Sequence, residues 1–577
     1  MTDVTRERAR DQPRTWPGMA IVLLQWIAVA ATGWIAPATA IQFFGMVGGP
    51  LVGLGLLLVW WLAFSRVSAA ERVVAALLML GCVVVSFPLM HRSAKLAFYT
   101  FGIPGACAAF VLAAWIARLR SRRSRLLLTA IAVAAVCLGW LLVRGEGVDG
   151  DMNFRYAWRW SATDEERLLR GGDTMVSEIA RADPLEPPAT VAWPGFRGAR
   201  RDGVVRGIEL ATDWSATPPR ELWRRLVGPG WSSFAVAGDR LYTQEQRGAE
   251  ELVRCYRAST GDVLWTHTDE ARFWESLAGA GPRATPTYHA GHIYAFGATG
   301  ILNCLDAETG TLLWRRDSAA DTAAVTPDWG FAGSPLVVDG LVVVHTGGTD
   351  GKAVVAYDAD HGEPRWYARA GTMSYSSAQL EIIDGVRQLV MLTGEGASAL
   401  APEDGAELWN YAWPMPGGAR IVQPALIGDG SLLIGTGFGM GVRRIALERR
   451  GEEWSVREDW TSTGLKPYYN DFVVHRDHVY GFDGRILAGL ELASGERVWK
   501  GGRYGNGQLL LLPDQDLLLV LSDRGEVALV AAVPDGFSEL TRFRAIEGRT
   551  WNHPVIADGV LFVRNGREMA AFRLPRR

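Results

Sequence analysis

The chain has 577 residues and a formal net charge of −3, with 49% hydrophobic and 21% charged residues. That length predicts two or more folded units. The first 150 residues contain 14 of the 59 Lys and Arg residues and 6 of the 62 Asp and Glu residues. The remainder therefore has 45 basic against 56 acidic residues. Because phosphate neutralisation requires clustered basic residues, this acidic remainder excludes a nucleic-acid partner.

Five apolar runs follow a basic N-terminal segment, residues 1–16, and each is long enough to cross a membrane. A hydrocarbon core about 30 Å thick requires about 20 apolar residues at 1.5 Å each. A cleavable signal peptide is the alternative interpretation for the first run alone. We therefore expect five transmembrane helices within residues 17–145, at Gly18–Ile35, Ile41–Phe64, Val73–Met90, Ala97–Ala117 and Leu126–Val143.

The arginines predict the orientation of these helices, because positively charged loops stay in the cytoplasm. The outer loops contain Arg92 and Lys95 before the chain leaves the membrane at Arg144. An odd number of crossings places everything after residue 145 outside the cytoplasm. The cytoplasmic segments then contain Arg6, Arg8, Arg10, Arg14, Arg66, Arg72, Arg118, Arg120, Arg122, Arg123 and Arg125.

Residues 146–190 are expected to form a juxtamembrane segment and linker. Phe154–Trp160 is aromatic and cationic, so it either lies at the lipid interface or packs under the next domain. Thr163 with Glu166 forms a capping box and predicts a short helix. Asp183–Pro188 is predicted to be an extended linker.

From about residue 220 the chain repeats one pattern, and this repeat decides the predicted fold. Each copy has a strand, an Asp-rich turn with Gly, and a second strand that ends in Trp, as in Leu305–Trp314 and Ala356–Trp366. A period of roughly 40 to 50 residues fits four short strands per unit and predicts a β-propeller over residues 191–577. Other copies end at Trp223, Trp265, Trp409, Trp460, Trp499 and near Phe543.

The two ends of the repeat array predict how the ring closes. Glu221–Arg225 is a last strand without the preceding three, whereas the final unit, Trp551–Leu574, has about three strands. We expect the N-terminal strand to complete the last blade, which gives eight four-stranded blades and removes an exposed edge. Asp339-Gly340 and Asp558-Gly559 predict hairpin turns within blades.

Two local patterns are interpreted as structural. Cys255 and Cys304 occupy matching positions of consecutive repeats. We expect buried thiols there rather than the alternative, a disulfide, because equivalent positions in neighbouring blades lie too far apart to bridge. Gly435–Gly441 is Gly-rich, but no helical pattern follows it, so a blade turn is favoured over a nucleotide site.

The turn D-A-x-T-G-x-x-x-W, as in Asp306–Trp314, resembles the pyrroloquinoline quinone (PQQ) repeat. Proteins with this repeat include the quinoprotein dehydrogenases and the propeller lipoprotein of outer-membrane β-barrel assembly, and the resemblance covers roughly residues 190–577. Five helices ahead of such a propeller resemble the membrane-bound quinoprotein glucose dehydrogenase. Trp193–Gly198 with Arg201–Gly203 resembles the first motif of PQQ-binding-like propeller repeat proteins. The resemblance implies a multi-pass protein of a bacterial inner membrane, with its propeller in the periplasm.

A polar residue precedes the innermost strand of every predicted blade, and two residues earlier another set lies on the same strand face. With Asn470 and Asn552, these two sets predict a polar funnel with an aromatic and cationic rim around the channel. The alternative is that the polar side chains tie neighbouring strands together and the aromatic rings fill gaps between blades. The first set is Ser233, Thr285, Ser334, Ser377, Gln423, Asp471, Gln508 and His553, and the second is Trp231, Arg283, Ala332, Tyr375, Ile421, Tyr469, Asn506 and Trp551.

A quinone cofactor of this class would require cations for its carboxylates, a Ca²⁺ ion held by carboxylate and amide oxygens, and an Asp base. Arg283, Lys466, Asn470 and Asp471 are the candidates, with Asp471 as the candidate base. The sequence lacks the adjacent cysteines of alcohol-oxidising members and the long insertions expected of a glucose dehydrogenase. It also lacks G-x-S-x-G, H-E-x-x-H and C-x-x-C patterns, so no metal site is predicted.

These observations predict a membrane-anchored propeller that acts as a binding scaffold. Its expected partners are the lipid bilayer and a periplasmic protein, peptide or glycan. The alternative function is that of a PQQ-dependent dehydrogenase, with PQQ and Ca²⁺ as cofactors. Such an enzyme would oxidise an alcohol or a sugar and pass the electrons to membrane quinone.

Overall fold

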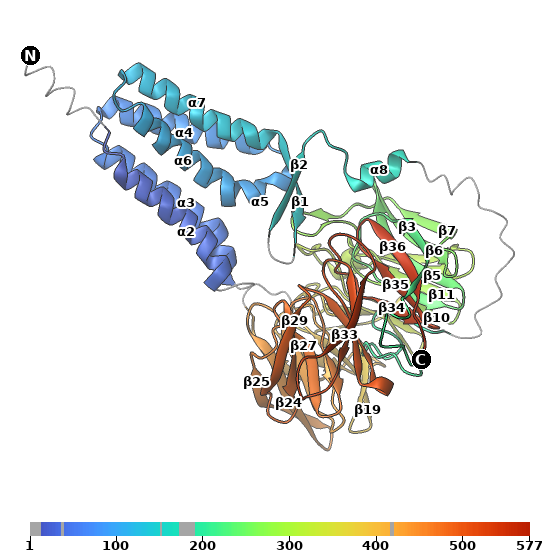
Figure 1. Ribbon diagram of the computed structural model, residues 1–577. Coiled ribbons are helices and arrows are strands. Elements are labelled where there is room, and N and C mark those ends of the chain that lie inside the picture. The colour runs from blue at the N-terminus through green and yellow to red at the C-terminus, as the bar shows by residue number, and fades with distance from the viewer. Residues whose placement is uncertain (1–12, 36–39, 150–152, 172–190, 416–419) are drawn as a thin grey trace, which may run out of the picture. The chain divides into compact units, whose positions relative to one another are not determined.

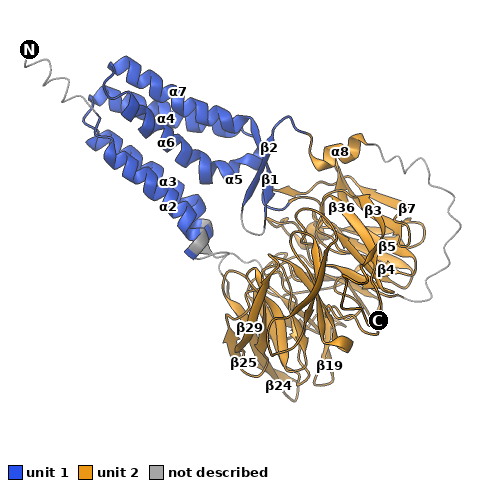
Figure 2. Cartoon of the chain, in the orientation of Figure 1, with its two compact units in different colours: residues 1–161, 276–278 blue, residues 162–275, 279–577 orange. Residues whose placement is uncertain are grey.

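The computed structural model describes residues 13–35, 40–149, 153–171, 191–415 and 420–577. The chain divides into two compact units (Figure 2). One unit comprises residues 1–161 with 276–278, and the other comprises residues 162–275 with 279–577. The predicted linker Asp183–Pro188 lies outside the described residues.

The first unit is a helical bundle (Figure 1). A buried cluster of apolar side chains, including Trp60, Trp61, Phe98 and Phe110, forms its core. The helices are α2 (Trp16–Ile35), α3 (Ala40–Phe64), α4 (Ala69–Leu89), η1 (Arg92–Ala94), α5 (Lys95–Ala97), the π-helical η2 (Phe98–Gly102), α6 (Ile103–Ile116) and α7 (Arg122–Leu141).

Among the described residues, four helices are long and apolar enough to cross a membrane, so the prediction of five is wrong. The difference lies in the first run, which forms α2: the described apolar part of this helix, Trp16–Thr32, is shorter than the four candidate spans. The four candidate spans are Phe44–Phe64, Ala69–Leu89, Arg92–Ile116 and Arg122–Leu141.

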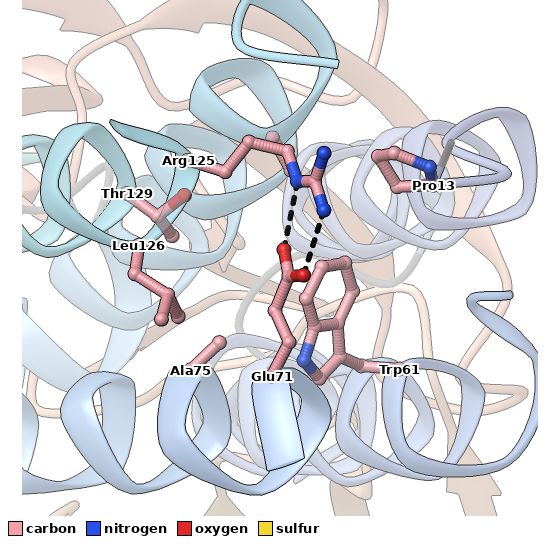
Figure 3. A pocket seen from close by; sticks show the side chains of 8 residues that line it. Pro13, Trp61, Glu71, Ala75, Arg125, Leu126 and Thr129 are labelled. Atoms are coloured by element: carbon pink, nitrogen blue, oxygen red, sulfur yellow. Dashed lines mark hydrogen bonds and ion pairs between the residues drawn. The ribbon is translucent and has the colours of Figure 1, made fainter. Parts of the chain in front are cut away.

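An ion pair joins α4 to α7 near the first residues of both helices (Figure 3). Arg125 donates through Nε and Nη2 to the two carboxylate oxygens of Glu71, at 2.8 and 2.7 Å. The Glu71 side chain is only 3% exposed. Pro13, Trp61 and Thr129 line the small cavity around the pair. Because a buried charge without its partner is strongly unfavourable, each residue depends on the other.

The segment after α7 forms a short hairpin, β1 (Val143–Val148) and β2 (Phe154–Trp158), and then a helix. Within the predicted interfacial segment, Trp158 and Trp160 stack at 5.2 Å and remain 55% and 69% exposed. The predicted short helix is confirmed as α8 (Asp164–Arg170), in the second unit, with both hydrogen bonds of the capping box formed.

The second unit is the predicted propeller of eight four-stranded antiparallel sheets, which confirms the all-β fold. Numbered from the first complete sheet, blade 1 has β4 (Ala235–Ala237), β5 (Arg240–Arg247), β6 (Glu250–Arg257) and β7 (Val263–Asp269). Blade 2 has β10 (Thr287–His289), β11 (His292–Phe296), β12 (Ile301–Asp306) and β13 (Leu312–Asp317). Blade 3 has β14 (Leu336–Val338), β15 (Leu341–His345), β16 (Val354–Asp358) and β17 (Pro364–Ala368). Blade 4 has β18 (Gln379–Ile383), β19 (Val386–Leu392), β20 (Gly396–Leu400) and β21 (Glu407–Ala412).

The remaining blades follow in the same way. Blade 5 has β22 (Ala425–Leu426), β23 (Leu432–Thr436), β24 (Gly441–Arg450) and β25 (Glu453–Ser462). Blade 6 has β26 (Val473–His475), β27 (His478–Asp483), β28 (Ile486–Glu491) and β29 (Arg497–Arg503). Blade 7 has β30 (Gln508–Leu512), β31 (Leu517–Leu521), β32 (Glu526–Ala531) and β33 (Glu539–Arg544). Blade 8 has β34 (Val555–Ala557), β35 (Val560–Arg564), β36 (Glu568–Arg573) and β3 (Arg220–Leu226), and the short elements between blades are β8 (Trp274–Glu275), β9 (Gly279–Ala280), α9 (Ser318–Thr322) and η3 (Pro513–Gln515).

The predicted closure of the ring is confirmed, because β3 pairs antiparallel with β36 (Figure 1). Arg224 lies opposite Ala570 in this pair, so the first strand of the propeller completes the last blade. The innermost strands are β4, β10, β14, β18, β22, β26, β30 and β34, which begin each blade in sequence and surround the axis. We call the end where these strands begin the entrance end.

The repeat motif forms the seams between neighbouring blades. In six of the eight blades, the Trp of the outermost strand bonds to the turn between the third and fourth strands of the next blade. Trp314, for example, donates through Nε1 to Ala359 O at 2.8 Å, and a Cβ added to Gly362 would lie 2.6 Å from its ring. The same indole-to-carbonyl bond, at 2.8–3.1 Å, joins Trp223 to Ala258, Trp265 to Ala307, Trp366 to Pro402, Trp460 to Leu492 and Trp499 to Val533.

Blade 7 departs from this motif. The strand register places Thr541 at the position that Trp occupies in other blades, whereas the sequence predicted a position near Phe543. A bulge precedes the Trp in the other blades, and in blade 7 the residue after the bulge is Thr541. The next turn is also missing, because β36 and β3 come from opposite ends of the propeller sequence. Trp214 fills the seam instead: its ring packs against Phe543 at 5.3 Å, and its backbone N–H donates to Thr541 Oγ1.

The smaller predictions for the propeller are also confirmed. Asp339 and Gly340 have φ values of 50° and 72°, as a left-handed hairpin turn requires. Cys255 and Cys304 are buried free thiols. The Gly-rich segment 435–441 contains the turn between β23 and β24, residues 437–440.

Gly362→Ala tests the docking role of the turn glycine. We expect this change to lower the free energy of unfolding of the propeller by about 2–4 kcal/mol, because it combines left-handed backbone strain with overpacking against Trp314. Gly340→Ala is the matched control, since Gly340 has nearly the same φ, +72° against +71°, but nothing lies within 4 Å of the added Cβ. Urea unfolding followed by tryptophan fluorescence measures both losses. Equal losses in the two variants would contradict the docking role.

Candidate functional site

The first set of predicted site residues forms a hydrogen-bonded ring at the entrance end. The backbone N–H of Ser233 donates to Thr285 Oγ1 at 3.0 Å, and that of Thr285 donates to Ser334 Oγ at 2.9 Å. The bonds from Ser334 N to Ser377 Oγ and from Gln423 N to Asp471 Oδ1 repeat the pattern. These four bonds connect equivalent positions, as the predicted alignment of blades requires, and they tie neighbouring innermost strands together.

The ring continues through blades 6 to 8 by other bonds. Gln508 Nε2 donates to the carbonyl oxygens of Tyr469 and Trp551, at 3.2 and 3.0 Å, and so bridges the two neighbouring blades. Asn552 Nδ2 donates to Ser232 O at 2.7 Å, and Ser233 Oγ donates to His553 O at the same distance. These predicted site residues have structural partners in the ring.

A segment that sequence reasoning did not place at the site closes the opposite end of the axis. Residues 193–211 form bridges with two innermost strands, from Trp193 to Val236 of β4 and from Val204 to Leu511 of β30. We call residues 193–211 the plug. The sequence motif of Trp193–Gly203 was the available signal, but nothing in it indicates that the segment crosses the axis.

Two arginines of the plug reach across the axis to different blades. Arg197 Nη1 pairs with Asp471 Oδ2 of blade 6 at 2.7 Å, and both side chains are 4% exposed. Arg201 donates to the carbonyl oxygens of Ser334, Pro335 and Ala378, in blades 3 and 4. Both arginines have a left-handed backbone, with φ values of 59° and 54°. Such conformations persist only where the surroundings hold them, as the guanidinium bonds do here.

Two titratable side chains of the ring, Asp471 and His553, lie next to the plug. Asp471 is held by Arg197 and by the Gln423 N–H, so this candidate base lies in a buried ion pair. Burial lowers the pKa of His553 to about 4. The negative charge of Asp471 opposes this shift, and the positive charge of Arg197 adds to it. The edge of the Phe196 ring packs on this imidazole at 4.9 Å. His553 is therefore neutral at physiological pH.

The entrance end presents a chain of half-buried aromatic rings, which we call the aromatic mouth: Trp231, Trp329, Tyr375, Tyr468, Tyr469 and Trp551. Adjacent ring centroids in this chain are 4.8–6.3 Å apart. Arg549 stacks on Trp231 and Trp551, at 4.9 and 4.7 Å. Trp329, Tyr468 and Arg549 were not predicted, since they lie in loops outside the aligned positions.

The predicted cationic residues are already paired. Arg283 contacts Glu275 at 3.3 Å, donates to Gly279 O and stacks on Phe273 at 4.8 Å. Lys466 pairs with Asp483 at 2.6 Å, and Asn470 Oδ1 accepts from the Tyr468 N–H. In the part of the chain that the structure describes, no three His, Cys, Asp or Glu side chains are placed to hold a metal ion. The residues present at the entrance end thus do not fit a tricarboxylate quinone with its Ca²⁺.

Comparisons with known proteins agree with the fold. Residues 249–501 match a family model described as outer membrane protein assembly factor BamB. The chain is 24% identical to that factor of Burkholderia pseudomallei over 334 residues, 49% of this chain and 84% of the relative. It is 26% identical to the factor of Xanthomonas campestris over 398 residues, 60% of this chain and 93% of the relative.

Quinohemoprotein alcohol dehydrogenase ADH-IIG of Pseudomonas putida is a further relative. It is 30% identical over 137 residues, which cover 23% of this chain but only 18% of that enzyme. A solved structure of the enzyme superimposes with a TM-score of 0.50 and 14% identity, over 67% of this chain and 80% of that one. At this identity the likeness concerns the fold alone.

His553→Asn tests the lowered pKa of this buried imidazole. The pKa of His553 is about 4 in the folded chain against 6.5 for an unperturbed imidazole, so the unfolded state binds more protons between these values. As far as this imidazole is concerned, the folded protein therefore keeps its full stability above this pH range and loses stability as the pH falls through it. Between neutral pH and about pH 5, the free energy of unfolding measured in urea should therefore fall by about 1–2 kcal/mol less in the variant than in the unmodified protein. An identical difference in both proteins would exclude His553 as the cause.

Proposed function

We propose that this PQQ-like propeller of the BamB type is a membrane-anchored binding scaffold, and that it binds its partner through the aromatic mouth. The observation that carries the proposal is the asymmetry of the axis. The plug closes one end with buried arginines, whereas the other end presents half-buried rings. Large rigid rings supply contact area at low conformational cost, which is why such residues dominate binding surfaces.

The partner class follows from the chemistry of the mouth. Its rings, with the stacked Arg549, suit a protein or peptide segment, or the face of a sugar ring. The relatives named as assembly factors favour a protein among these choices. The predicted funnel residues Ser233, Thr285, Ser377 and Gln423 then support the mouth from below, rather than contacting the partner directly.

The alternative, a PQQ-dependent dehydrogenase, is favoured only by the short match to ADH-IIG. It would require free cations and an accessible base at the entrance end. Arg283, Lys466 and Asp471 are instead held by Glu275, Asp483 and Arg197. The scaffold is therefore the function that these residues support better.

We also infer that the propeller lies on the periplasmic side of a bacterial inner membrane. This inference does not depend on whether α2 crosses. Arg66 lies between α3 and α4, and Arg72 lies in the first turn of α4. Arg118 and Arg120 lie between α6 and α7, and Arg122, Arg123 and Arg125 lie in the first turn of α7. If both groups stay in the cytoplasm, α7 must carry the chain outward.

A reporter that functions only in the cytoplasm tests this orientation. Fused after Gly150, it should be silent, because the residues after α7 have crossed the membrane. Fused after Arg120, it should be active, since that position lies in the second basic loop. Activity after Gly150 would reverse the orientation.

A photo-crosslinking amino acid at Val325 tests the scaffold function. Val325 is 86% exposed in the loop that carries Trp329. We expect this probe to crosslink a periplasmic protein, and Trp231→Ala with Trp551→Ala to reduce the yield about tenfold, because the two rings form one continuous surface. Trp454→Ala, in the β24–β25 hairpin, is the matched control and should leave the yield unchanged. Unchanged crosslinking in the double variant would place the binding surface elsewhere.

The same purified protein, mixed with PQQ and Ca²⁺, provides the second arm of this experiment. The scaffold proposal expects neither a bound chromophore nor alcohol- or sugar-dependent dye reduction. Appearance of both would favour the dehydrogenase.

A further inference from the structure

A charged groove lies at the seam between blades 7 and 8, beside the closing strand β3. It has a volume of about 390 Å³ and is lined by Arg224, Arg544, Ala545, Ile546, Glu547, Arg567 and Glu568. Arg224 lies on β3, Arg544 ends β33, and Arg567 with Glu568 lies at the β35–β36 hairpin. The groove therefore exists only because strands from opposite ends of the propeller sequence meet here.

Arg224 is a fixed part of this groove. Its Nη1 pairs with Glu568 at 2.9 Å, and its Nη2 pairs with Glu221 at 2.7 Å and donates to Ala545 O at 2.7 Å. Glu568 is also bound through its other oxygen, which accepts from the Glu547 N–H at 2.7 Å. The charges of Arg224 and Glu568 are thus committed to each other and to the seam.

Arg544 and Arg567 differ from Arg224, because their charges are poorly neutralised. Arg544 approaches Glu526 only to 3.6 Å, and Arg542 approaches the same carboxylate at 3.5 Å. Arg567 approaches Asp164 of α8 only to 4.0 Å. Both side chains are 57% exposed. Two guanidinium groups that have no hydrogen-bonded acid among the described residues therefore line one groove.

We propose that this groove binds a small anion, a carboxylate or a phosphate, between Arg544 and Arg567. A guanidinium presents donors in a planar fork that matches the oxygens of either group. Glu547 lines the same groove and opposes negative charge there, so it limits the affinity. This site is separate from the aromatic mouth, and the inference does not depend on the proposed scaffold function.

Calorimetric titration of the full-length protein in detergent tests the site, with inorganic phosphate in one arm and succinate in the other. At low ionic strength, where such contacts are least screened, we expect saturable binding in at least one arm. Binding of phosphate alone, of succinate alone, or of both identifies the anion. Arg544→Gln with Arg567→Gln should weaken binding about tenfold or more, since each removes a charge-assisted contact.

Two further variants separate this site from a general charge effect. Glu547→Gln should strengthen binding, because it removes an opposing charge from the lining. Arg450→Gln is the matched control: Arg450 is 83% exposed and approaches Glu448 only to 3.7 Å, so its loss should change nothing. Trp231→Ala with Trp551→Ala should also leave anion binding unchanged. Absence of saturable binding in both arms, or equal weakening by Arg450→Gln, would overturn the proposal.

Discussion

The propeller depends on one repeated contact, an indole packed under the glycine of the next blade. The ring of Trp314 lies where a side chain on Gly362 would otherwise stand, and its N–H bonds the carbonyl of Ala359. The contact sets both the distance and the rotation between neighbouring sheets, because a planar ring and a left-handed turn fit together in one way. The short innermost strands can therefore vary in sequence while the ring keeps its geometry.

Within the described part of the chain, two seams of the propeller lack this contact, and both lack the short turn that it requires. Blade 5 has a long β24–β25 hairpin instead of the short turn, and Trp409 of blade 4 donates to Gln388 of its own blade. At the last seam the turn is interrupted by the ends of the propeller sequence, and Trp214 packs there instead. The plug then connects blades 3, 4 and 6 across the axis through Arg201 and Arg197. Closure thus rests on side chains from the segment before β3.

The sequence was sufficient to predict the eight blades, the closing strand and the alignment of the innermost positions, because a repeat fixes equivalent positions. It was misleading for the first apolar run, which is not among the four candidate spans of the described residues. It also could not place Arg197 and Arg201, because a loop that crosses the axis has no periodic pattern. The hydrogen bonds among Ser233, Thr285 and Ser334 were foreseen only as an alternative, since polar residues that line a channel and polar residues that tie strands have the same spacing.

The pairing of β3 with β36 has a consequence for biosynthesis. Arg224 and Glu568, which meet in this blade, are 344 residues apart in the sequence. Among the strands of the propeller, a ribosome makes β3 before all the others and β36 after all the others, so the closing strand has no partner for nearly the whole time in which the propeller is synthesised. Pairings between such distant segments form slowly. An incomplete chain therefore exposes an unpaired strand and an open ring, and a chaperone that holds such strands would have its substrate here.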